Sequence, residues 1–198
     1  MKKFIAATSN KGKLKEIVEI LDGLPYEVIS MEEAGVKKDI EETGRTFEEN
    51  AFIKAKEIFD ATGQIVMADD SGLEVDFLNG APGIYSSRFA GEGATDEDKN
   101  NKLLKLLEGV PFEKRTARFV CAIAVIFPDG NHFTVKASCE GHIAYKPGGS
   151  NGFGYDPLFF LTEYNMTTAQ MTSSEKHKIS HRGKALRLMV EKLKDIKF

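Results

Sequence analysis

Residues 3–21, KFIAATSNKGKLKEIVEIL, decide the fold class, because they predict a strand, a polar turn and a helix in immediate succession. The apolar run at residues 3–7 has the length of a buried strand. Beyond the turn, helical spacing is kept by Leu14, Ile17, Val18 and Leu21, and the helix is expected to end at Asp22-Gly23. A second strand is predicted at residues 26–29. This strand–helix–strand order favours an α/β sheet with parallel pairing.

The rest of the chain continues the same pattern. Thr46 and Glu49 are spaced as a helix capping box, and the helix that they begin is expected to end near Gly63. Residues 65–68 predict a strand that ends on Asp69-Asp70-Ser71-Gly72. Further expected elements are a helix at 95–107, a hairpin of strands at 116–127 and 132–139, a Gly-rich loop at 148–154 and an amphipathic helix at 185–193. Because no linker or repeat interrupts the chain, we expect one domain over residues 1–198, an α/β fold with a mixed central sheet flanked by helices.

Composition limits the partners and the compartment. The chain has 198 residues and a formal net charge of −3, which excludes nucleic-acid binding driven by a global basic field. Its longest apolar runs are far too short to span a membrane, and the N-terminal one is too short for the core of a signal peptide. The two cysteines, Cys121 and Cys139, fit no zinc spacing and suit a reducing compartment. We therefore expect a cytoplasmic protein with neither a nucleic-acid nor a membrane partner.

The first candidate site is the turn Thr8-Ser9-Asn10-Lys11-Gly12-Lys13, between the first strand and the first helix. Backbone N–H groups and the positive end of the helix dipole meet there, and small side chains let an anion approach closely. The spacing differs from that of a P-loop. From the residues alone, a phosphate site and an ordinary helix cap with solvated lysines both remain open.

The second candidate site combines two acidic segments, Glu41-Glu42-Thr43-Gly44 and Asp69-Asp70-Ser71-Gly72. Carboxylates at the ends of strands in α/β folds often face the ligand crevice. Mg²⁺ usually takes one or two protein carboxylates and completes its shell with water and phosphate oxygens. The alternative is an exposed acidic loop together with an Asx-type turn.

Two further segments, residues 150–157 and 173–182, carry candidate groups for binding a flat ligand. Glycines around Phe153 allow its ring to be presented to a base, and such stacking is worth about 1–3 kcal/mol. Alternatively, Phe153 and Tyr155 fold back into the core. The second segment gathers several hydrogen-bond donors, but its histidines lack the H-E-x-x-H pattern, which disfavours zinc. Its alternative is a solvated, basic helix start.

Taken together and in this order, the motifs resemble the inosine triphosphate pyrophosphatase family, whose members hydrolyse ITP, dITP and XTP. The resemblance covers nearly the whole chain, and Ser9 stands where many relatives have Gly. The matching segments are Thr8-Ser9-Asn10 with Lys13 and Glu16, Glu41-Glu42-Thr43-Gly44, Ala68-Asp69-Asp70-Ser71-Gly72-Leu73, Gly80-Ala81-Pro82-Gly83-Ile84-Tyr85-Ser86-Ser87-Arg88, Phe153-Gly154-Tyr155-Asp156-Pro157 and Ser180-His181-Arg182-Gly183.

The resemblance implies two lobes with the active-site cleft between them, a homodimer, and Mg²⁺-dependent hydrolysis of a nucleoside triphosphate to the monophosphate and pyrophosphate. It implies metal binding by Glu41 and Asp70, with Asp70 also activating the water and Ser71 beside the substrate; whether Glu41 or Glu42 is the ligand stays open. It implies triphosphate binding by Thr8, Ser9, Asn10, Lys11, Gly12 and Lys13. It implies base binding by Phe153, Gly154, Tyr155, Asp156, Lys176, His181 and Arg182.

Three alternative functions differ in the features that they would require. A related pyrophosphatase for a pyrimidine or modified base would differ only in its substrate. A nucleotide-binding sensor without turnover is disfavoured by the paired acidic segments, because binding alone gains little from a general base. An RNA-binding module would need a basic stripe with interleaved aromatic residues, and the scattered charge does not supply one.

Overall fold

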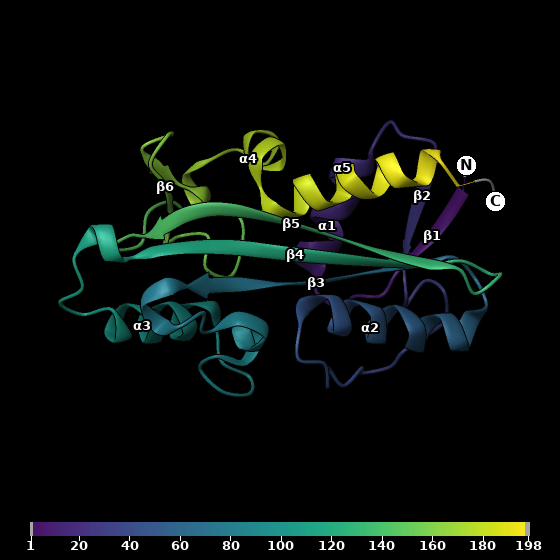
Figure 1. The fold of residues 1–198 in the computed structure, drawn as a ribbon, viewed down its shortest axis with the longest axis horizontal. Helices are drawn as coiled ribbons and strands as arrows, with labels where there is room; N and C mark the ends of the chain where they lie inside the picture. The colour runs from purple at the N-terminus through teal and green to yellow at the C-terminus, as the bar shows by residue number, and fades with distance from the viewer. Residues whose placement is uncertain (1, 197–198) are drawn as a thin grey trace. The chain divides into compact units, whose positions relative to one another are not determined.

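The computed structural model describes residues 2–196. The strands within these residues form one seven-stranded sheet with the order β2-β1-β3-β4-β5-β6-β7 (Figure 1). Strand β1 pairs in parallel with β2 and β3, whereas β6 pairs antiparallel with β5 and β7. The prediction of an α/β fold with a mixed central sheet is thus confirmed. The strands are β1 Lys2–Ala6, β2 Tyr26–Ser30, β3 Val66–Val75, β4 Thr116–Ile126, β5 His132–Ile143, β6 Phe159–Leu161 and β7 Met166–Thr167.

Five α-helices flank the strands within the same residues. They are α1 Lys11–Leu21, α2 Phe47–Thr62, α3 Asp96–Leu106, α4 Ser173–Ile179 and α5 His181–Lys194. Short 3-10 helices lie at Asp76–Leu78, Gly83–Arg88, Phe112–Lys114 and Thr168–Gln170. Between residues 2 and 196, no helix is both long and apolar enough to cross a membrane.

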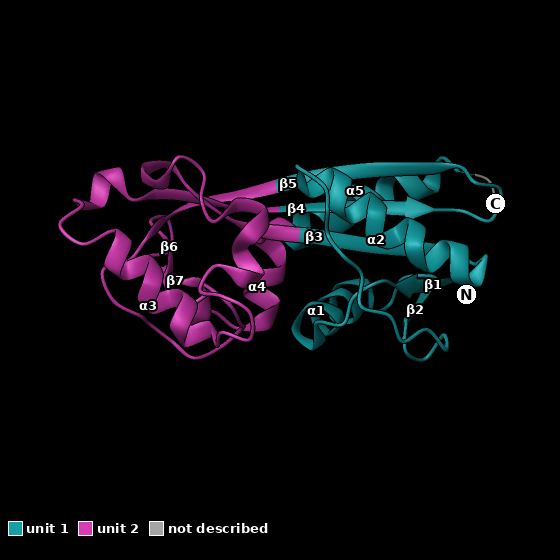
Figure 2. Cartoon of the chain, turned by 90° about the horizontal axis from the view of Figure 1, so that it is seen from below, with its two compact units in different colours: residues 1–70, 121–137, 182–198 teal, residues 71–120, 138–181 magenta. Residues whose placement is uncertain are grey.

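The chain divides into two compact units (Figure 2). Unit 1 comprises residues 1–70, 121–137 and 182–198, and unit 2 comprises residues 71–120 and 138–181. Three strands, β3, β4 and β5, contribute residues to both units. Each unit has its own hydrophobic core.

In unit 1, α1 and α5 pack on one face of the sheet and α2 packs on the other (Figure 1). The shared core of α1, α5 and the strands includes Ile17, Leu186, Met189, Met67 and Ile123. Helix α2 buries Ala51, Ala55 and Ile58. It begins after Thr46, whose hydroxyl accepts the Glu49 N–H, and it ends at Gly63, which adopts the left-handed conformation that glycine permits at low cost. The predicted bounds of this helix are confirmed.

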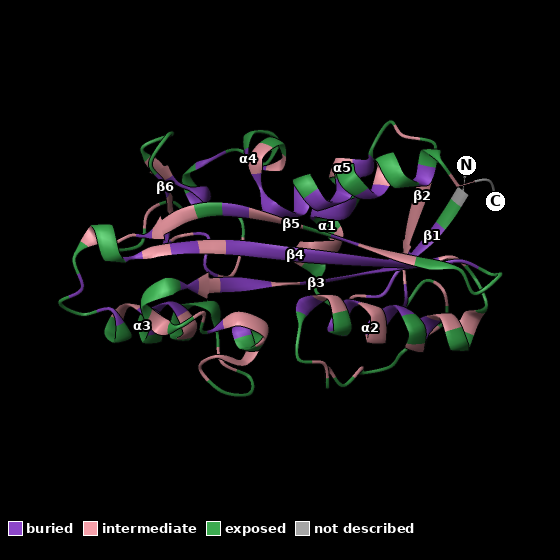
Figure 3. Ribbon diagram, viewed as in Figure 1, coloured by how far each residue is buried: buried purple, intermediate pink, exposed green. Residues whose placement is uncertain are grey.

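In unit 2, helix α3 begins after Thr95, which forms a reciprocal capping box with Asp98. Its C-terminal half inserts Leu103 into a core that also contains Leu73 and Phe159. Strand β4, which contributes Ala117 and Phe119 to this core, is buried over most of its length (Figure 3). The two anchoring leucines, Leu103 and Leu107, are fully buried. Helix α3 is therefore fixed to its core by apolar packing at one end and by a cap at the other.

The structure corrects the expected end of one strand. Strand β3 does not stop at Asp69-Asp70 but continues to Val75, so both aspartates lie inside the strand. The continuation is stabilised by Leu73 and Val75, which are both fully buried. Strand β5 likewise extends beyond residue 139, to Ile143. Val18, expected on the buried face of α1, is 46% exposed.

Candidate active site

The turn before α1 has the geometry of a helix cap. Asn10 is the N-cap residue, and its side-chain oxygen accepts the Lys13 N–H at 3.0 Å. The Thr8 hydroxyl accepts the Asn10 N–H at 3.2 Å. Ser9, Asn10 and Lys11 are exposed. The turn thus presents the amides of Lys11 and Gly12, the positive end of the helix dipole and the Lys11 side chain, which is the arrangement that binds anions at helix N-termini.

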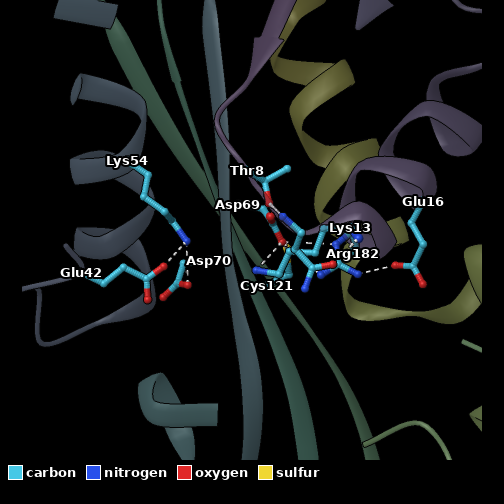
Figure 4. A network of polar contacts seen from close by, with 10 residues as sticks. Thr8, Lys13, Glu16, Glu42, Lys54, Asp69, Asp70, Cys121 and Arg182 are labelled. Atoms are coloured by element: carbon cyan, nitrogen blue, oxygen red, sulfur yellow. Dashed lines mark hydrogen bonds and ion pairs between the residues drawn. The ribbon is translucent and has the colours of Figure 1, made fainter. Parts of the chain in front are cut away.

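Lys13 points instead toward a buried group of charges around Asp69, which we call the Asp69 cluster (Figure 4). The ammonium of Lys13 lies 3.4 Å from Asp69 Oδ2. Arg182, from α5, donates to the same oxygen through Nε at 3.2 Å and Nη2 at 3.1 Å, and its Nη1 donates to Glu16 of α1. Asp69 and Arg182 are each 1% exposed. The cluster therefore places two cations against one deeply buried carboxylate.

The cluster controls the ionisation of its members. Burial disfavours the charged form of Asp69, but Lys13 and Arg182 outweigh it and hold the pKa of this carboxyl well below its usual range. The Cys121 thiol lies 3.9 Å from Asp69 Oδ2, and burial together with Asp69 raises its pKa to about 12. At neutral pH the carboxylate is ionised and the thiol is protonated, so Cys121 is not a nucleophile here.

Asp70 belongs to a second group of charges, because neighbouring residues in a strand point to opposite faces (Figure 4). The ammonium of Lys54, from α2, donates to Asp70 Oδ1 at 3.0 Å and to Glu42 Oε1 at 2.7 Å. Lys54 thereby connects the loop before α2 with the middle of β3. Burial raises the pKa of Asp70, although Lys54 opposes that shift. We call Glu42, Lys54 and Asp70 the Asp70 cluster.

The Asp70 cluster has the donors that a magnesium ion needs. Asp70 Oδ2 is buried and has no hydrogen-bond partner, which is costly for a carboxylate oxygen unless a ligand satisfies it. Glu42 supplies a second carboxylate, since it binds the same ammonium. Two carboxylates are the usual protein share of a Mg²⁺ site. Among residues 2–196, no three or more His, Cys, Asp or Glu side chains gather as a metal-binding group.

Of the two candidate ligands left open by the sequence, Glu41 and Glu42, it is Glu42 that shares the Lys54 ammonium with Asp70. Glu41 is exposed, whereas Glu42 is half-buried and bound to Lys54. The following Gly44 holds this loop against α2 by donating its N–H to Asn50 Oδ1 at 2.8 Å. A Cβ at Gly44 would lie 2.6 Å from that oxygen, so the approach requires glycine.

The predicted base-binding residues of unit 2 form a connected group around Asp156. Asp156 Oδ2 accepts the Lys176 ammonium at 2.6 Å and the Phe153 N–H at 2.9 Å, while Oδ1 accepts the Thr168 hydroxyl at 2.8 Å. The same ammonium lies 5.2 Å from the centroid of the half-buried Phe153 ring. Phe153 and Lys176 are therefore held beside each other, as a ring and a cation.

Four other predicted residues have different surroundings. The ring of His181 stacks on Phe119, with centroids 4.7 Å apart and an interplanar angle of 17°. Tyr155 is buried in the core of unit 2 and donates its hydroxyl to Ser86 O at 2.7 Å, and burial raises its pKa. Arg182, predicted to bind the base, is in unit 1 with Glu16 and Asp69. Ser71 follows Asp70 in β3 and is half-buried.

Sequence reasoning missed Lys54 and Asn50. Both are buried and lie one turn apart in α2, where they contact the acidic segments. A signal for Lys54 was present, because it is spaced three and four residues from Ala51 and Ile58 on the apolar face of the helix. A lysine on an apolar helix face is buried only when it is paired.

Comparison with known proteins places the chain in a family. The model of the Ham1 family matches residues 4–192. A dITP/XTP pyrophosphatase of Desulforamulus reducens is 51% identical over 96% of this chain and 94% of its own, and one of Bacillus licheniformis is 52% identical over 94% and 95%. A solved HAM1 protein of Coxiella burnetii superposes with a TM-score of 0.89 at 42% identity, covering 99% of this chain and 100% of its own. The chain is therefore a member of the Ham1 family.

Proposed function

We propose that this protein hydrolyses the deaminated purine nucleoside triphosphates ITP, dITP and XTP, and so removes them from the nucleotide pool before incorporation into DNA or RNA. The proposed reaction is NTP + H₂O → NMP + pyrophosphate. Relatives about 50% identical over almost the full length are dITP/XTP pyrophosphatases. The observation that carries the proposal is the position of Asp69 and Asp70 in β3. Asp69 belongs to the Asp69 cluster on one face of the strand, and Asp70 belongs to the Asp70 cluster on the other.

In this proposal, the turn before α1 binds the triphosphate. The first-turn amides and Lys11 neutralise phosphate oxygens, and small residues at the turn allow the oxygens to approach. Lys13 contributes positive charge from the same turn of helix, with Asp69 fixing its side chain. Positioning and charge stabilisation of this kind supply most of the catalysis of phosphoryl transfer.

Asp70 and Glu42 would hold Mg²⁺, with Lys54 keeping the two carboxylates in place. When bound there, Mg²⁺ would supply Lewis-acid chemistry, which stabilises negative charge on phosphate and makes the attacking water more acidic. Asp70 would orient that water toward the α-phosphorus and accept its proton. Pyrophosphate would then leave as a stable anion.

In unit 2, Phe153 would stack on the base while Lys176 and His181 donate to its 6-keto oxygen. Adenine has an amino group at that position, so a donor there would face a donor and stay unpaired. Sites that leave buried polar groups unpaired discriminate by about 10⁴–10⁵. Arg182 is assigned no base contact in this proposal, because its guanidinium is bound to Glu16 and Asp69.

Two further features belong to the proposal, the homodimer from the resemblance to the family and the location from the composition of the chain. We propose a homodimer, which light scattering at micromolar concentration measures directly. We also propose that the protein acts in the cytoplasm, where the nucleotide pool is located.

The test is to quantify monophosphate and pyrophosphate released from a panel of ITP, dITP, XTP, GTP, ATP and pyrimidine triphosphates, with and without Mg²⁺. The proposal requires ITP, dITP and XTP to be hydrolysed much faster than GTP. Hydrolysis of ATP should be negligible. Preference for a pyrimidine would assign the related activity instead. Tight binding of ITP without any turnover would identify a sensor.

The identity of the second metal ligand leads to a prediction for two adjacent residues. We expect Glu42→Gln to weaken apparent Mg²⁺ affinity by at least about tenfold, because it removes a carboxylate next to Asp70. We expect excess Mg²⁺ to restore part of the activity. Glu41→Gln is the matched control and is expected to behave as wild type, because Glu41 is exposed. Titration of turnover against Mg²⁺ measures both, and the reverse result would place the ligand at Glu41.

A further inference from the structure

We propose that Asp96 and Asn100 of α3 are positioning residues that clamp the backbone of Gly154 and thereby set how Phe153 meets the substrate base. This inference deepens the proposed function and rests on it. All of these residues belong to unit 2.

The clamp binds both polar groups of one peptide residue. Asp96 Oδ2 accepts the Gly154 N–H at 2.6 Å, and Asn100 Nδ2 donates to Gly154 O at 2.9 Å. Asp96 and Asn100 are four residues apart and so lie on the same side of α3. Holding both the N–H and the C=O of Gly154 fixes the orientation of its two peptide planes.

The backbone conformation of Gly154 sets the path of the segment 153–156. Gly154 has φ of +64°, which residues with a Cβ rarely adopt. Its conformation decides the direction in which the chain leaves Phe153 and enters the buried Tyr155. Asp156 holds the Phe153 N–H, and Ser86 O holds the Tyr155 hydroxyl. The clamp adds a support from α3, which is itself anchored by Leu103 and Leu107.

The side chain of Asn100 is buried at a cost in stability. It is 6% exposed, and its Oδ1 is buried without a hydrogen-bond partner. An unpaired buried oxygen is destabilising, so an apolar residue would serve a purely structural role better. The contact also favours the ionised form of Asp96. The Lys99 ammonium and the Gly154 N–H outweigh burial and lower the pKa of this carboxyl. These features agree with a role in aiming the loop.

The test uses variants that reverse, remove or retain one half of the clamp. Asn100→Asp replaces the donor with a carboxylate oxygen facing Gly154 O, Asp96→Ala removes the acceptor, and Asp96→Asn retains an acceptor. Asp98→Ala is the matched control, because the Asp98 carboxylate lies in the same first turn but accepts hydrogen bonds from Thr95 instead of Gly154. The KM and kcat for ITP and ATP are measured, together with amide hydrogen exchange of the peptide containing residues 150–158.

We expect Asn100→Asp and Asp96→Ala to raise the KM for ITP by roughly tenfold or more, because each removes a hydrogen bond that fixes the stacking ring. We expect the kcat for ITP to change far less and the ITP-to-ATP ratio of kcat/KM to narrow. Amide exchange in residues 150–158 should accelerate. Asp96→Asn should restore most of the KM, and Asp98→Ala should lower the melting temperature without changing either readout.

Unchanged exchange in Asn100→Asp would overturn the clamp. Faster exchange with an unchanged KM would show a structural contact without a role in base binding, which also overturns the proposal. Absence of ITP turnover in the wild type would instead contradict the proposed function, and the exchange measurement separates the two cases because it requires no substrate.

Discussion

Replacing Asp70 with Asn is expected to lower the rate of pyrophosphate release from ITP by roughly 10³–10⁴-fold. The change preserves the shape of the side chain but removes the carboxylate that is proposed both to hold Mg²⁺ and to accept the proton of the water. The free Oδ2 of Asp70 is buried and unpartnered in the described structure, so it is available for that chemistry. Single-turnover measurements at saturating ITP and Mg²⁺ give the rate of the chemical step.

The fold and the nucleotide site of this variant should survive. Burial raises the pKa of Asp70, which means that the ionised carboxylate destabilises the folded protein relative to the unfolded chain. Replacing it with a neutral amide removes this cost. Lys54 retains Glu42 as a partner at 2.7 Å. We therefore expect a melting temperature at or above that of the wild type, together with measurable ITP binding by calorimetry. Turnover near the wild-type rate would remove Asp70 from the mechanism.

The same substitution at the preceding residue, Asp69→Asn, should have the opposite effect on stability. It leaves the buried cations Lys13 and Arg182 without their shared carboxylate. Breaking a buried ion pair on one side costs about 3–5 kcal/mol. For a protein of this size that corresponds to a fall in melting temperature of roughly 6–20 °C. Asp70→Asn is the matched control, because it is the same chemical change one residue later in β3.

The pH dependence of that loss has a definite sign. The pKa of Asp69 is lowered in the folded protein, so its contribution to stability is fully present above the pKa of the unfolded chain, about 4. The contribution decreases as the pH falls below that value toward the lower folded pKa. The difference in melting temperature between wild type and Asp69→Asn should therefore be largest at neutral pH and shrink below about pH 4. A difference independent of pH would show that packing, rather than charge, is responsible.

Local signals in the sequence predicted most helices and strands, because the start and end of these elements depend on nearby residues. Thr46 and Gly63 mark the ends of α2, and Thr95 marks the start of α3. The short elements β6, β7 and α4 were not predicted, since two to seven residues carry little periodicity. The end of β3 was misplaced because Asp69-Asp70-Ser71-Gly72 has the polarity of a turn. These polar residues stay in the strand because distant residues neutralise and bury them.

In the candidate site, too, the local motifs were predictable and the contacts between distant residues were not. The turn before α1 was recognised from its residues, as were the acidic segments and the glycines around Phe153. That Glu42 and Asp70 share one ammonium was not predictable, because it depends on Lys54 of α2 reaching both carboxylates. The partners of Arg182 were equally inaccessible, since Asp69 and Glu16 are brought to it by the packing of α1 and α5. Tertiary contacts between remote residues are the part that periodicity and spacing do not encode.

The arrangement of unit 1 has a consequence for the order in which the protein is made. Its charged centre joins Asp69 to a residue 113 positions later, and Glu16 to that same Arg182 across 166 positions. During synthesis Glu16, Lys13 and Asp69 leave the ribosome long before Arg182 exists. Until then the carboxylates of Asp69 and Glu16 lack their guanidinium partner, and α5 is absent from the face of the sheet that it covers. Unit 1 can therefore close only after α5, the last of the described helices, has been made. A polypeptide terminated before α5 would leave the ribosome with this centre incomplete.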